Sequence, residues 1–290
     1  MAMLAYKAPS TAEEAVQILA GASGRAKVLS GGTDLLVQLR SGRTKPELIV
    51  DIKKVPGISG IRERDGGFVI GAATSGAEIG EHEGLKKAWP GVVEAANLIG
   101  STQVQGRASL GGNLCNASPA ADSVPALIAA RATCVIVGGK GRREVPVESV
   151  ATGPGRTSLA PDEFVLEFHL PKRPPRSADA YLRFIPRTEM DIAVVGAGVN
   201  LTLDAAGVIK DAHVALGAVA PTALLVPDAA KALVGRKLDE TALAGLDAAC
   251  RRACKPIDDK RGTIEYRVKV AGVMARRAAA IAHERAGEHK

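Results

Sequence analysis

The segment SLGGNLCNASPAADSVPAL, residues 109–127, is rich in small and polar side chains and contains the adjacent glycines Gly111 and Gly112. A second pair of adjacent glycines lies in LSGGTDLL, residues 29–36. Glycine has no Cβ, so its backbone can come close to a ligand. The N–H groups of such a loop can turn toward an anion, and phosphate is the usual one. The two segments therefore predict two phosphate-binding loops.

A diphosphate that links two nucleosides is the natural ligand for two phosphate loops on one domain. LSGGTDLL does not fit the G-x-G-x-x-G pattern of a Rossmann dinucleotide site, and no stretch fits the GxxxxGK[ST] pattern of a P-loop. HExxH and GxSxG are also absent, and five histidines leave little for a hydrolase or a metalloenzyme to use. The remaining alternative is that both glycine pairs are tight turns without a ligand.

The composition is that of an ordinary globular protein, with 290 residues, 46% hydrophobic and 24% charged. No apolar run reaches the roughly 18 to 20 residues that a membrane span needs, and the N-terminus lacks the pattern of a signal peptide. The four cysteines are scattered without a CxxC pair, which is typical of reduced thiols. We therefore expect a cytoplasmic protein with no metal site of its own, and expect Cys250 and Cys254 to be buried apolar thiols.

The net charge of +7 is concentrated at the C-terminal end, where residues 251–290 carry eleven Lys or Arg against five Asp or Glu. A basic segment of this kind can bind nucleic acid. Here acids and alanines separate the basic residues, and Tyr266 is the only aromatic residue available for stacking on bases. A solvated helix face or a protein docking surface is the better interpretation, and we expect no nucleic-acid partner.

The order of patterns predicts two units of mixed helix and strand. The first unit begins with a helix at 11–20, a strand at 26–30, the first glycine pair, a second helix and a strand at 47–51. The second helix is expected to have Leu35, Leu36 and Leu39 on its inner face and to stop at Gly42. The unit continues with strands at 68–73, 134–137, 145–147 and 163–170 and helices from about 77, at 91–100 and at 125–132. The proline-rich stretch PKRPPRS, residues 171–177, predicts a boundary.

The second unit reads as antiparallel strands followed by helices. Strands are predicted at 180–185, 192–203 and 209–215, with DAAG at 204–207 as a hairpin turn. Helical spacing begins at Ala229, and the longest predicted helix is 264–286. These patterns indicate an α+β unit.

Four segments together resemble one family: LSGGTDLLVQL from Leu29, IGAATSGAEI from Ile70, the stretch from Gly100 to Leu127, and YLRFIPRTEMDIAVV from Tyr181. In order and spacing they are similar to the FAD-binding medium subunit of molybdenum hydroxylases, the family of xanthine dehydrogenase and aerobic carbon monoxide dehydrogenase. The resemblance covers nearly the whole chain. It implies an α+β fold in which a two-lobed FAD-binding domain of the vanillyl-alcohol oxidase (PCMH) type is followed by a C-terminal domain of antiparallel strands and helices.

The resemblance also implies domain limits and a cofactor site. The FAD-binding domain is expected at 1–175, with lobes at about 1–55 and 56–175, and the C-terminal domain at 178–290. The implied cofactor-binding residues are Leu29, Ser30, Gly31, Gly32, Thr33, Asp34, Leu35, Leu36, Thr74, Ile99, Ser109, Gly111, Gly112, Asn113, Asp122, Val165 and Arg183. The FAD diphosphate is expected between the two glycine loops.

The resemblance assigns roles to a few of these residues. Asp122 is expected to accept hydrogen bonds from ribose or adenine, Ile99 and Val165 to contact the cofactor with apolar side chains, and Arg183 to lie near the flavin as a cation that favours its anionic reduced form. Simpler interpretations stay open: Asp34 caps its helix, and Ile99 and Val165 are core residues. Another is that Arg187 and Asp191 form a pair across a turn.

This sequence departs from the family at two places. Gln105-Gly106 stands where Arg-Asn is common, and Arg183 stands where Lys is common, which affects the hydrogen bonding expected at the flavin edge. The cysteine-rich insertion of the 4-hydroxybenzoyl-CoA reductase branch is missing.

The resemblance implies an electron-transfer subunit without catalytic residues of its own. Substrate would be oxidised at a molybdenum cofactor in a large partner, and electrons would pass through [2Fe-2S] clusters in a small partner to FAD in this chain and then to an external acceptor. A dimer of heterotrimers is the expected assembly. The alternative is a self-contained FAD oxidoreductase of the same fold, resembling the enolpyruvyl reductase of peptidoglycan synthesis, which would need a proton donor near the flavin.

Overall fold

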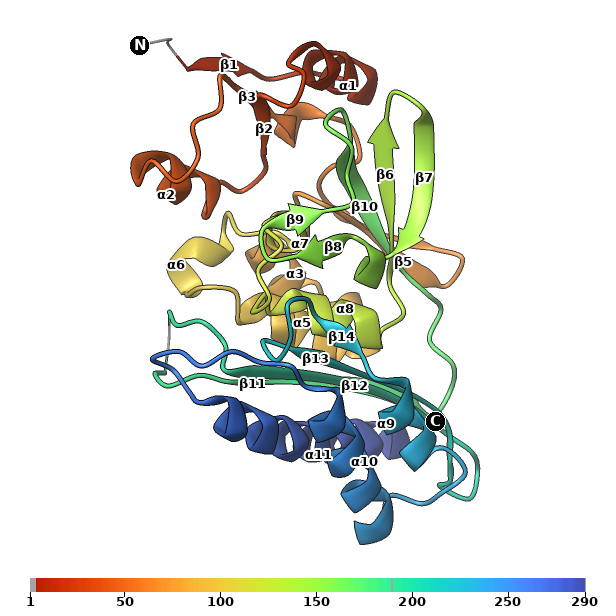
Figure 1. The fold of residues 1–290 in the computed structure, drawn as a ribbon. Helices are drawn as coiled ribbons and strands as arrows, with labels where there is room; N and C mark the ends of the chain where they lie inside the picture. Colours follow the sequence, from red (N-terminus) through yellow and green to blue (C-terminus); the bar gives the residue numbers. More distant parts are fainter. Residues whose placement is uncertain (1–3, 189, 290) are drawn as a thin grey trace.

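The computed structural model describes residues 4–188 and 190–289. Three sheets follow one another along the molecule, from an N-terminal lobe through a central lobe to a C-terminal sheet covered by helices (Figure 1). The α+β fold with a C-terminal domain of antiparallel strands and helices is confirmed.

The N-terminal lobe is a parallel sheet of order β1-β3-β2 with two helices. Its elements are β1 (Ala5–Lys7), α1 (Ala12–Gly21), β2 (Ala26–Leu29), α2 (Leu35–Arg40), β3 (Leu48–Asp51) and the 3₁₀ turn η1 (Ile52–Lys54). Helix α1 begins at the Thr11 hydroxyl, which accepts a hydrogen bond from the Glu14 N–H at 3.1 Å. Its apolar stripe packs into the core that the central lobe also uses.

Helix α2 differs from the prediction. Leu35, Leu36 and Leu39 were expected on a buried inner face, but α2 buries no residue, and Leu36 is 49% exposed. The helix has six residues and lies at the side of its lobe (Figure 1), so no sheet face covers its leucines. Gly42 does follow the end of the helix with a positive φ of 69°, as expected for a stop.

The central lobe is a five-stranded antiparallel sheet of order β4-β5-β10-β6-β7, with helices packed against it. Its strands are β4 (Ile61–Arg64), β5 (Gly67–Gly71), β6 (Thr133–Gly138), β7 (Gly141–Pro146) and β10 (Phe164–Leu170). Its helices are α3 (Gly76–Glu81), α4 (Glu83–Ala88), α5 (Pro90–Asn97), α6 (Thr102–Gln105), α7 (Leu110–Cys115) and α8 (Ser123–Ala129). The short turn η2 (Val147–Ser149) and the hairpin of β8 (Ala151–Gly153) and β9 (Arg156–Thr157) complete it.

The C-terminal domain is an antiparallel sheet of order β11-β12-β13-β14. Its elements are β11 (Ser177–Phe184), β12 (Val195–Leu203), β13 (Ile209–Gly217), β14 (Leu224–Leu225), α9 (Pro227–Leu233), α10 (Glu240–Ala253) and α11 (Ile264–Glu288). The predicted DAAG hairpin is confirmed, because Asp204 Oδ1 accepts from the N–H groups of Ala206 and Val208, both at 2.8 Å, and Gly207 has φ of 77°.

Helices cover both faces of this sheet, which fixes the C-terminal domain against the central lobe. Helix α11 lies on one face, and α5 and α8 of the central lobe lie on the other (Figure 1). The approach of α8 is close, since a Cβ on Gly198 of β12 would lie 2.7 Å from the Pro125 carbonyl oxygen. The start of α8 is therefore held directly over β12 and β13.

The expectations about membrane spans and cysteines can be compared with the described residues. In residues 4–188 and 190–289 no helix is long and apolar enough to cross a membrane. All four cysteines carry free thiols, with Cys250 buried and Cys254 partly buried.

Candidate functional site

The two glycine segments meet where the N-terminal lobe faces the central lobe. The Ser30 and Ser109 hydroxyl oxygens lie 2.9 Å apart. Nearby, Gln38 Nε2 of α2 donates to Asn116 Oδ1 at 2.9 Å. Lys53 Nζ donates to the Ser30 carbonyl oxygen at 3.2 Å. The structure therefore brings together the two segments that the sequence singled out.

Several of these glycines serve a purpose other than the expected one. A Cβ on Gly31 would lie 1.7 Å from the Arg107 carbonyl oxygen, and a Cβ on Gly111 would lie 2.6 Å from that of Ala72. Gly32 has φ of 82°, which side chains rarely adopt. These glycines let backbone segments of the protein approach one another, so the presence of a ligand is not needed to explain them.

The second segment is not the loop that was expected. Residues 110–115 form helix α7, and Ser109 is its N-cap, with a hydroxyl that accepts from the Gly112 N–H at 3.2 Å. The cap outweighs the poor helix propensity of two glycines. Asn113 Oδ1 in turn accepts from the Ser123 N–H at 3.1 Å and from the Ser123 hydroxyl at 2.7 Å, which ties α7 to the start of α8.

Helix α3 begins beside α7. Ser75 caps α3 in a capping box with Glu78, and it pairs with Ser109 in an isolated antiparallel bridge. Thr74, which precedes this cap, is fully buried, and its hydroxyl donates to the Gly60 carbonyl oxygen at 3.1 Å. The Thr74 side chain is thus engaged within the protein, and its role beside a cofactor stays a prediction.

Asp34 precedes α2 at the N-cap position, but its side chain makes no capping hydrogen bond. The interpretation of Asp34 as a helix cap is therefore wrong, because its φ and ψ of −96° and −50° are already helical. The side chain remains accessible to solvent, and the desolvation it does have raises the pKa of its carboxyl above the usual value.

A buried ion pair lies between α8 and the C-terminal domain. Arg183 Nη1 donates to Asp122 Oδ2 at 3.0 Å and to the Leu98 carbonyl oxygen at 2.7 Å, and the Tyr181 hydroxyl lies 3.3 Å from Asp122 Oδ1. Burial raises the pKa of Asp122 to about 6, although Arg183 acts in the opposite direction. Three predicted positions are thus close together: Asp122, Arg183 and Ile99, which follows Leu98.

This pair changes the electrostatic role expected for Arg183. Its side chain is 5% exposed and faces a carboxylate, so its positive charge is balanced within the protein. The ribose contact expected for Asp122 stays a prediction. The Arg187–Asp191 pair, left open above, is formed, with Nε 3.1 Å from Oδ2.

The two apolar positions, Val165 and Ile99, differ in burial. Val165 lies in β10, is 3% exposed and belongs to the main hydrophobic core, which supports its interpretation as a core residue. Ile99 is only half-buried, so its side chain can contact a bound molecule. Cofactor contact stays a prediction for both.

Sequence reasoning missed several residues that shape the site. Tyr181 is 59 positions from its partner Asp122, and Leu98 is 85 positions from Arg183. The Arg107 carbonyl, on which Gly31 packs, carries no side-chain signal at all. Only the helix cap could have been found, because Ser109 precedes a short apolar-spaced run.

Comparison with known proteins gives matches along almost the whole chain. Residues 2–173 match the family model described as FAD binding domain in molybdopterin dehydrogenase, and residues 180–282 match the CO dehydrogenase flavoprotein C-terminal domain. The chain is 32% identical to the carbon monoxide dehydrogenase medium chain of Hydrogenophaga pseudoflava over 94% of both chains. It is 30% identical to a putative xanthine dehydrogenase FAD-binding subunit of Escherichia coli, over 94% of this chain and 93% of that one.

Solved structures agree with these matches. The chain superposes on reconstituted CO dehydrogenase from Oligotropha carboxidovorans with a TM-score of 0.94, at 31% identity, over 98% of both chains. Its superposition on quinoline 2-oxidoreductase from Pseudomonas putida has a TM-score of 0.89 at 25% identity, again over 98% of both chains.

Proposed function

This chain belongs to the FAD-binding medium subunits of molybdenum hydroxylases, and we propose that it is the electron-transfer subunit of such a complex. It takes electrons from [2Fe-2S] clusters in a small partner and passes them to an external acceptor. Substrate is oxidised in a large partner that carries the molybdenum cofactor. The observation that carries the proposal is the meeting of the two glycine segments at Ser30 and Ser109, in a chain that matches medium chains end to end.

The place where the two glycine segments meet at Ser30 and Ser109, which we call the joint, suits the diphosphate of FAD. Bound FAD would supply the electron carrier. The donors are the hydroxyls of Ser30, Thr33 and Ser109 and the backbone N–H groups at the start of α2. The position a Cβ on Gly112 would take meets only the Ser109 hydroxyl, at 3.2 Å, so there is open space on that side. We assign the diphosphate to this joint.

The flavin end is assigned to Ile99 and Thr74. Arg183 acts there by holding the Leu98 carbonyl at 2.7 Å, which fixes the backbone before Ile99. Asp122 holds Arg183 in turn and is retained as the ribose or adenine contact. The other predicted cofactor residues, Leu29, Gly31, Gly32, Asp34, Leu35, Leu36, Gly111, Asn113 and Val165, are retained as parts of the same site.

The proposal includes the arrangement of the chain and its complex. The FAD-binding domain spans 1–175 and the C-terminal domain 178–290, in line with the end of β10 at Leu170 and the start of β11 at Ser177. The complex is a dimer of heterotrimers in the cytoplasm, a compartment that suits four free thiols.

The self-contained oxidoreductase is the weaker alternative. It needs a proton donor near the flavin, and Tyr181 is the hydroxyl beside Arg183. Tyr181 is buried, and burial raises its pKa well above the usual value, so the phenol releases its proton poorly. The match over 94% of the length of a medium chain also favours a subunit.

Rapid mixing tests the proposal. The FAD-loaded chain is mixed without oxygen with the reduced [2Fe-2S] partner from its own complex. The flavin absorbance is expected to fall as the absorbance of the oxidised cluster returns. A chain that holds FAD and binds the partner, yet whose flavin stays oxidised, would overturn the electron-transfer role.

A further inference from the structure

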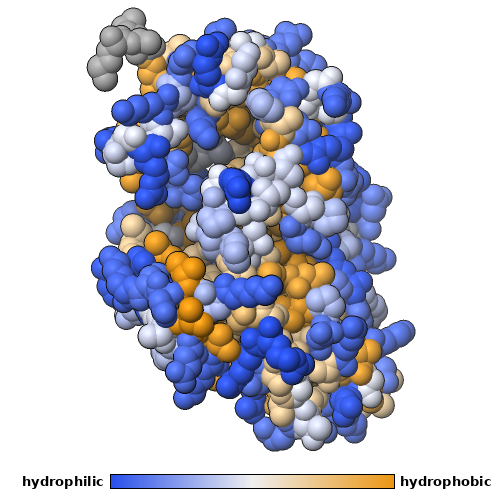
Figure 2. Space-filling view, viewed as in Figure 1, coloured by the Kyte–Doolittle hydropathy of each residue, from blue (hydrophilic) through white to orange (hydrophobic). Residues whose placement is uncertain are grey.

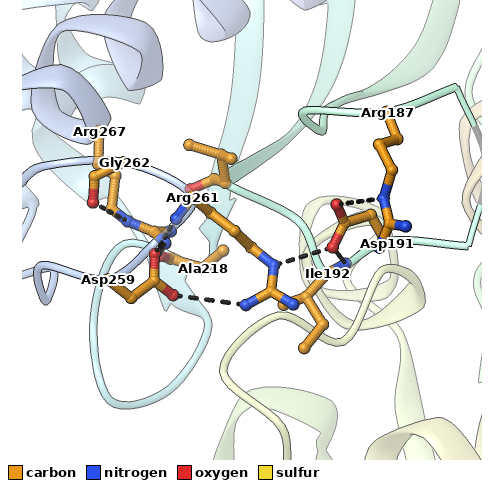
Figure 3. A network of polar contacts seen from close by, with 9 residues as sticks. Arg187, Asp191, Ile192, Ala218, Asp259, Arg261, Gly262 and Arg267 are labelled. Carbon is orange, nitrogen blue, oxygen red and sulfur yellow. Dashed lines mark hydrogen bonds and ion pairs between the residues drawn. The ribbon is translucent and has the colours of Figure 1, made fainter.

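A charged network joins two loops of the C-terminal domain (Figure 3). The first loop connects β11 to β12, and its described residues are 185–188 and 190–194. The second loop, residues 254–263, connects α10 to α11. Asp191 links them, because its Oδ1 accepts from Arg261 Nε at 2.9 Å and its Oδ2 from Arg187 Nε at 3.1 Å. These bonds hold the pKa of Asp191 well below its usual range, so the carboxylate stays charged.

The network is anchored to the body of the domain by Arg267. This side chain is 3% exposed, and its Nη2 donates to Asp259 Oδ1 at 2.7 Å. Its Nη1 donates to the Val194 carbonyl oxygen at 2.9 Å. Both loops are thus fixed to α11 and to the start of β12.

These fixed loops expose large apolar side chains. Ile192 is 52% exposed, Ile257 68%, Ile264 46% and Tyr266 42%. We call these four residues the apolar loop patch. Figure 2 shows a band of hydrophobic side chains on this face of the molecule, bordered by hydrophilic ones. Large apolar side chains that well-anchored loops expose to solvent are typical of a surface that a partner protein covers.

The patch lies beside the segment assigned to the flavin. The Met190 sulfur is 3.8 Å from the position that a Cβ on Gly100 would take, so the first loop touches the residue after Ile99. Arg183, just before this loop, binds the Leu98 carbonyl. A protein bound on the patch is therefore close to the expected flavin, and electron transfer requires such closeness.

The rim of the patch is basic. Lys255 and Lys260 are exposed, and the Arg187 side chain is 71% exposed. The carboxylates of Asp191 and Asp259 face arginines within the network. Two further acids beside the patch, Asp258 and Glu265, are exposed, but the three exposed basic residues outnumber them, so the net charge toward solvent is positive. An apolar centre with a basic rim fits a partner with an apolar centre and an acidic rim.

We infer that the apolar loop patch is the docking surface for the small [2Fe-2S] partner. The inference rests on the proposed function, which requires that partner to reach the flavin. The basic residues of the rim steer the partner, and the isoleucines are buried on docking.

The test uses the complete complex, with a double variant that spares the fold. Ile257→Glu changes an exposed loop residue, and Ile264→Glu places an acid at the first residue of α11, where a helix favours it. The matched control is Val234→Glu at the end of α9, which is 43% exposed. Gly235 bonds to Ile209 at the start of β13, so this control lies at the other end of the sheet.

Each complex is co-expressed and purified, and three quantities are measured: FAD per chain, retention of each partner at rising salt, and mass of the assembly. The double variant is expected to bind the [2Fe-2S] partner about tenfold more weakly or worse, with FAD unchanged, while Val234→Glu behaves as wild type. Unchanged retention of that partner would overturn the inference, as would loss of FAD, of the large partner or of self-association alone. A wild-type chain without FAD or without any [2Fe-2S] partner would instead contradict the proposed function.

Discussion

The hydroxyl oxygens of Ser30 and Ser109 lie 2.9 Å apart, although 79 positions separate them in the sequence. Ser30 ends the first strand-turn segment of the N-terminal lobe, and Ser109 caps α7 of the central lobe. Their contact makes the two lobes share one site. Changes that separate the two segments should therefore weaken FAD binding.

Gly31→Ala should separate the two glycine segments most directly. The added Cβ would lie 1.7 Å from the Arg107 carbonyl oxygen, so one backbone segment must move. We expect a loss of about 1–3 kcal/mol of stability and weaker FAD binding. Gly21→Ala is the matched control, because no atom lies within 4 Å of its Cβ position. Equal melting temperatures and equal FAD affinities for Gly31→Ala and wild type would contradict the packing described for Gly31.

Ser109→Ala should weaken the same joint by a different route. The substitution removes the acceptor for the Gly112 N–H and the partner of the Ser30 hydroxyl. Loss of a helix cap costs about 1 kcal/mol, which urea unfolding can measure. Ser109→Thr keeps a hydroxyl and should recover most of the stability. If alanine is as stable as serine here, the cap does not hold α7.

Asp122 should give the folded protein a distinctive pH dependence. Burial raises its pKa to about 6, above the ordinary value of 3.8, so the folded state binds this proton more tightly than the unfolded state does. Its contribution to stability is complete below about pH 4 and falls by about 3 kcal/mol as the pH rises through about 6. Asp122→Asn should lack this decline in urea unfolding. A constant difference between variant and wild type from about pH 4 to about pH 7 would disprove the raised pKa.

Asp179 should hold the C-terminal domain on the central lobe. Its Oδ1 lies 2.6 Å from Arg173 Nη2, and its Oδ2 accepts from the Val92 N–H of α5 at 3.1 Å. Asp179→Ala leaves Arg173 buried without a carboxylate, so we expect a loss of about 3–5 kcal/mol. Asp228→Ala, which breaks an exposed pair with Lys231, should leave stability nearly unchanged, because solvent screens such a pair. Similar losses for the two variants would contradict this role.

Most of the strands and the long helices could be predicted because their signals are local. The turn at Asp204 to Gly207 is specified by one carboxylate and one glycine, and the helix predicted at 264–286 appears as α11, Ile264–Glu288. Helix α7 was missed because two adjacent glycines are typical of a loop, whereas the hydrogen bond from the Gly112 N–H to the Ser109 cap stabilises a helix here. The leucines of α2 had helical spacing, but spacing does not tell whether a surface exists for them to cover.

The sequence predicted which segments form the site, but it did not predict which residues contact one another there. Asp122 and Arg183 were both identified through the family resemblance, but their ion pair joins positions 61 residues apart and follows from the packing of α8 on the C-terminal sheet. The backbone approach of Gly31 to Arg107 has the same origin. Such contacts depend on the assembled fold, so residue patterns do not specify them.

The central claim is that the joint of the two glycine segments holds FAD, and FAD binding by the purified complex tests it most directly. The flavin is removed, and FAD is titrated back with flavin fluorescence as the measure, for wild type and for Gly31→Ala. We expect wild type to bind about one FAD per chain with a Kd near or below about 1 μM, and Gly31→Ala to bind more weakly while Gly21→Ala does not. A folded wild-type chain that binds no FAD would contradict the account.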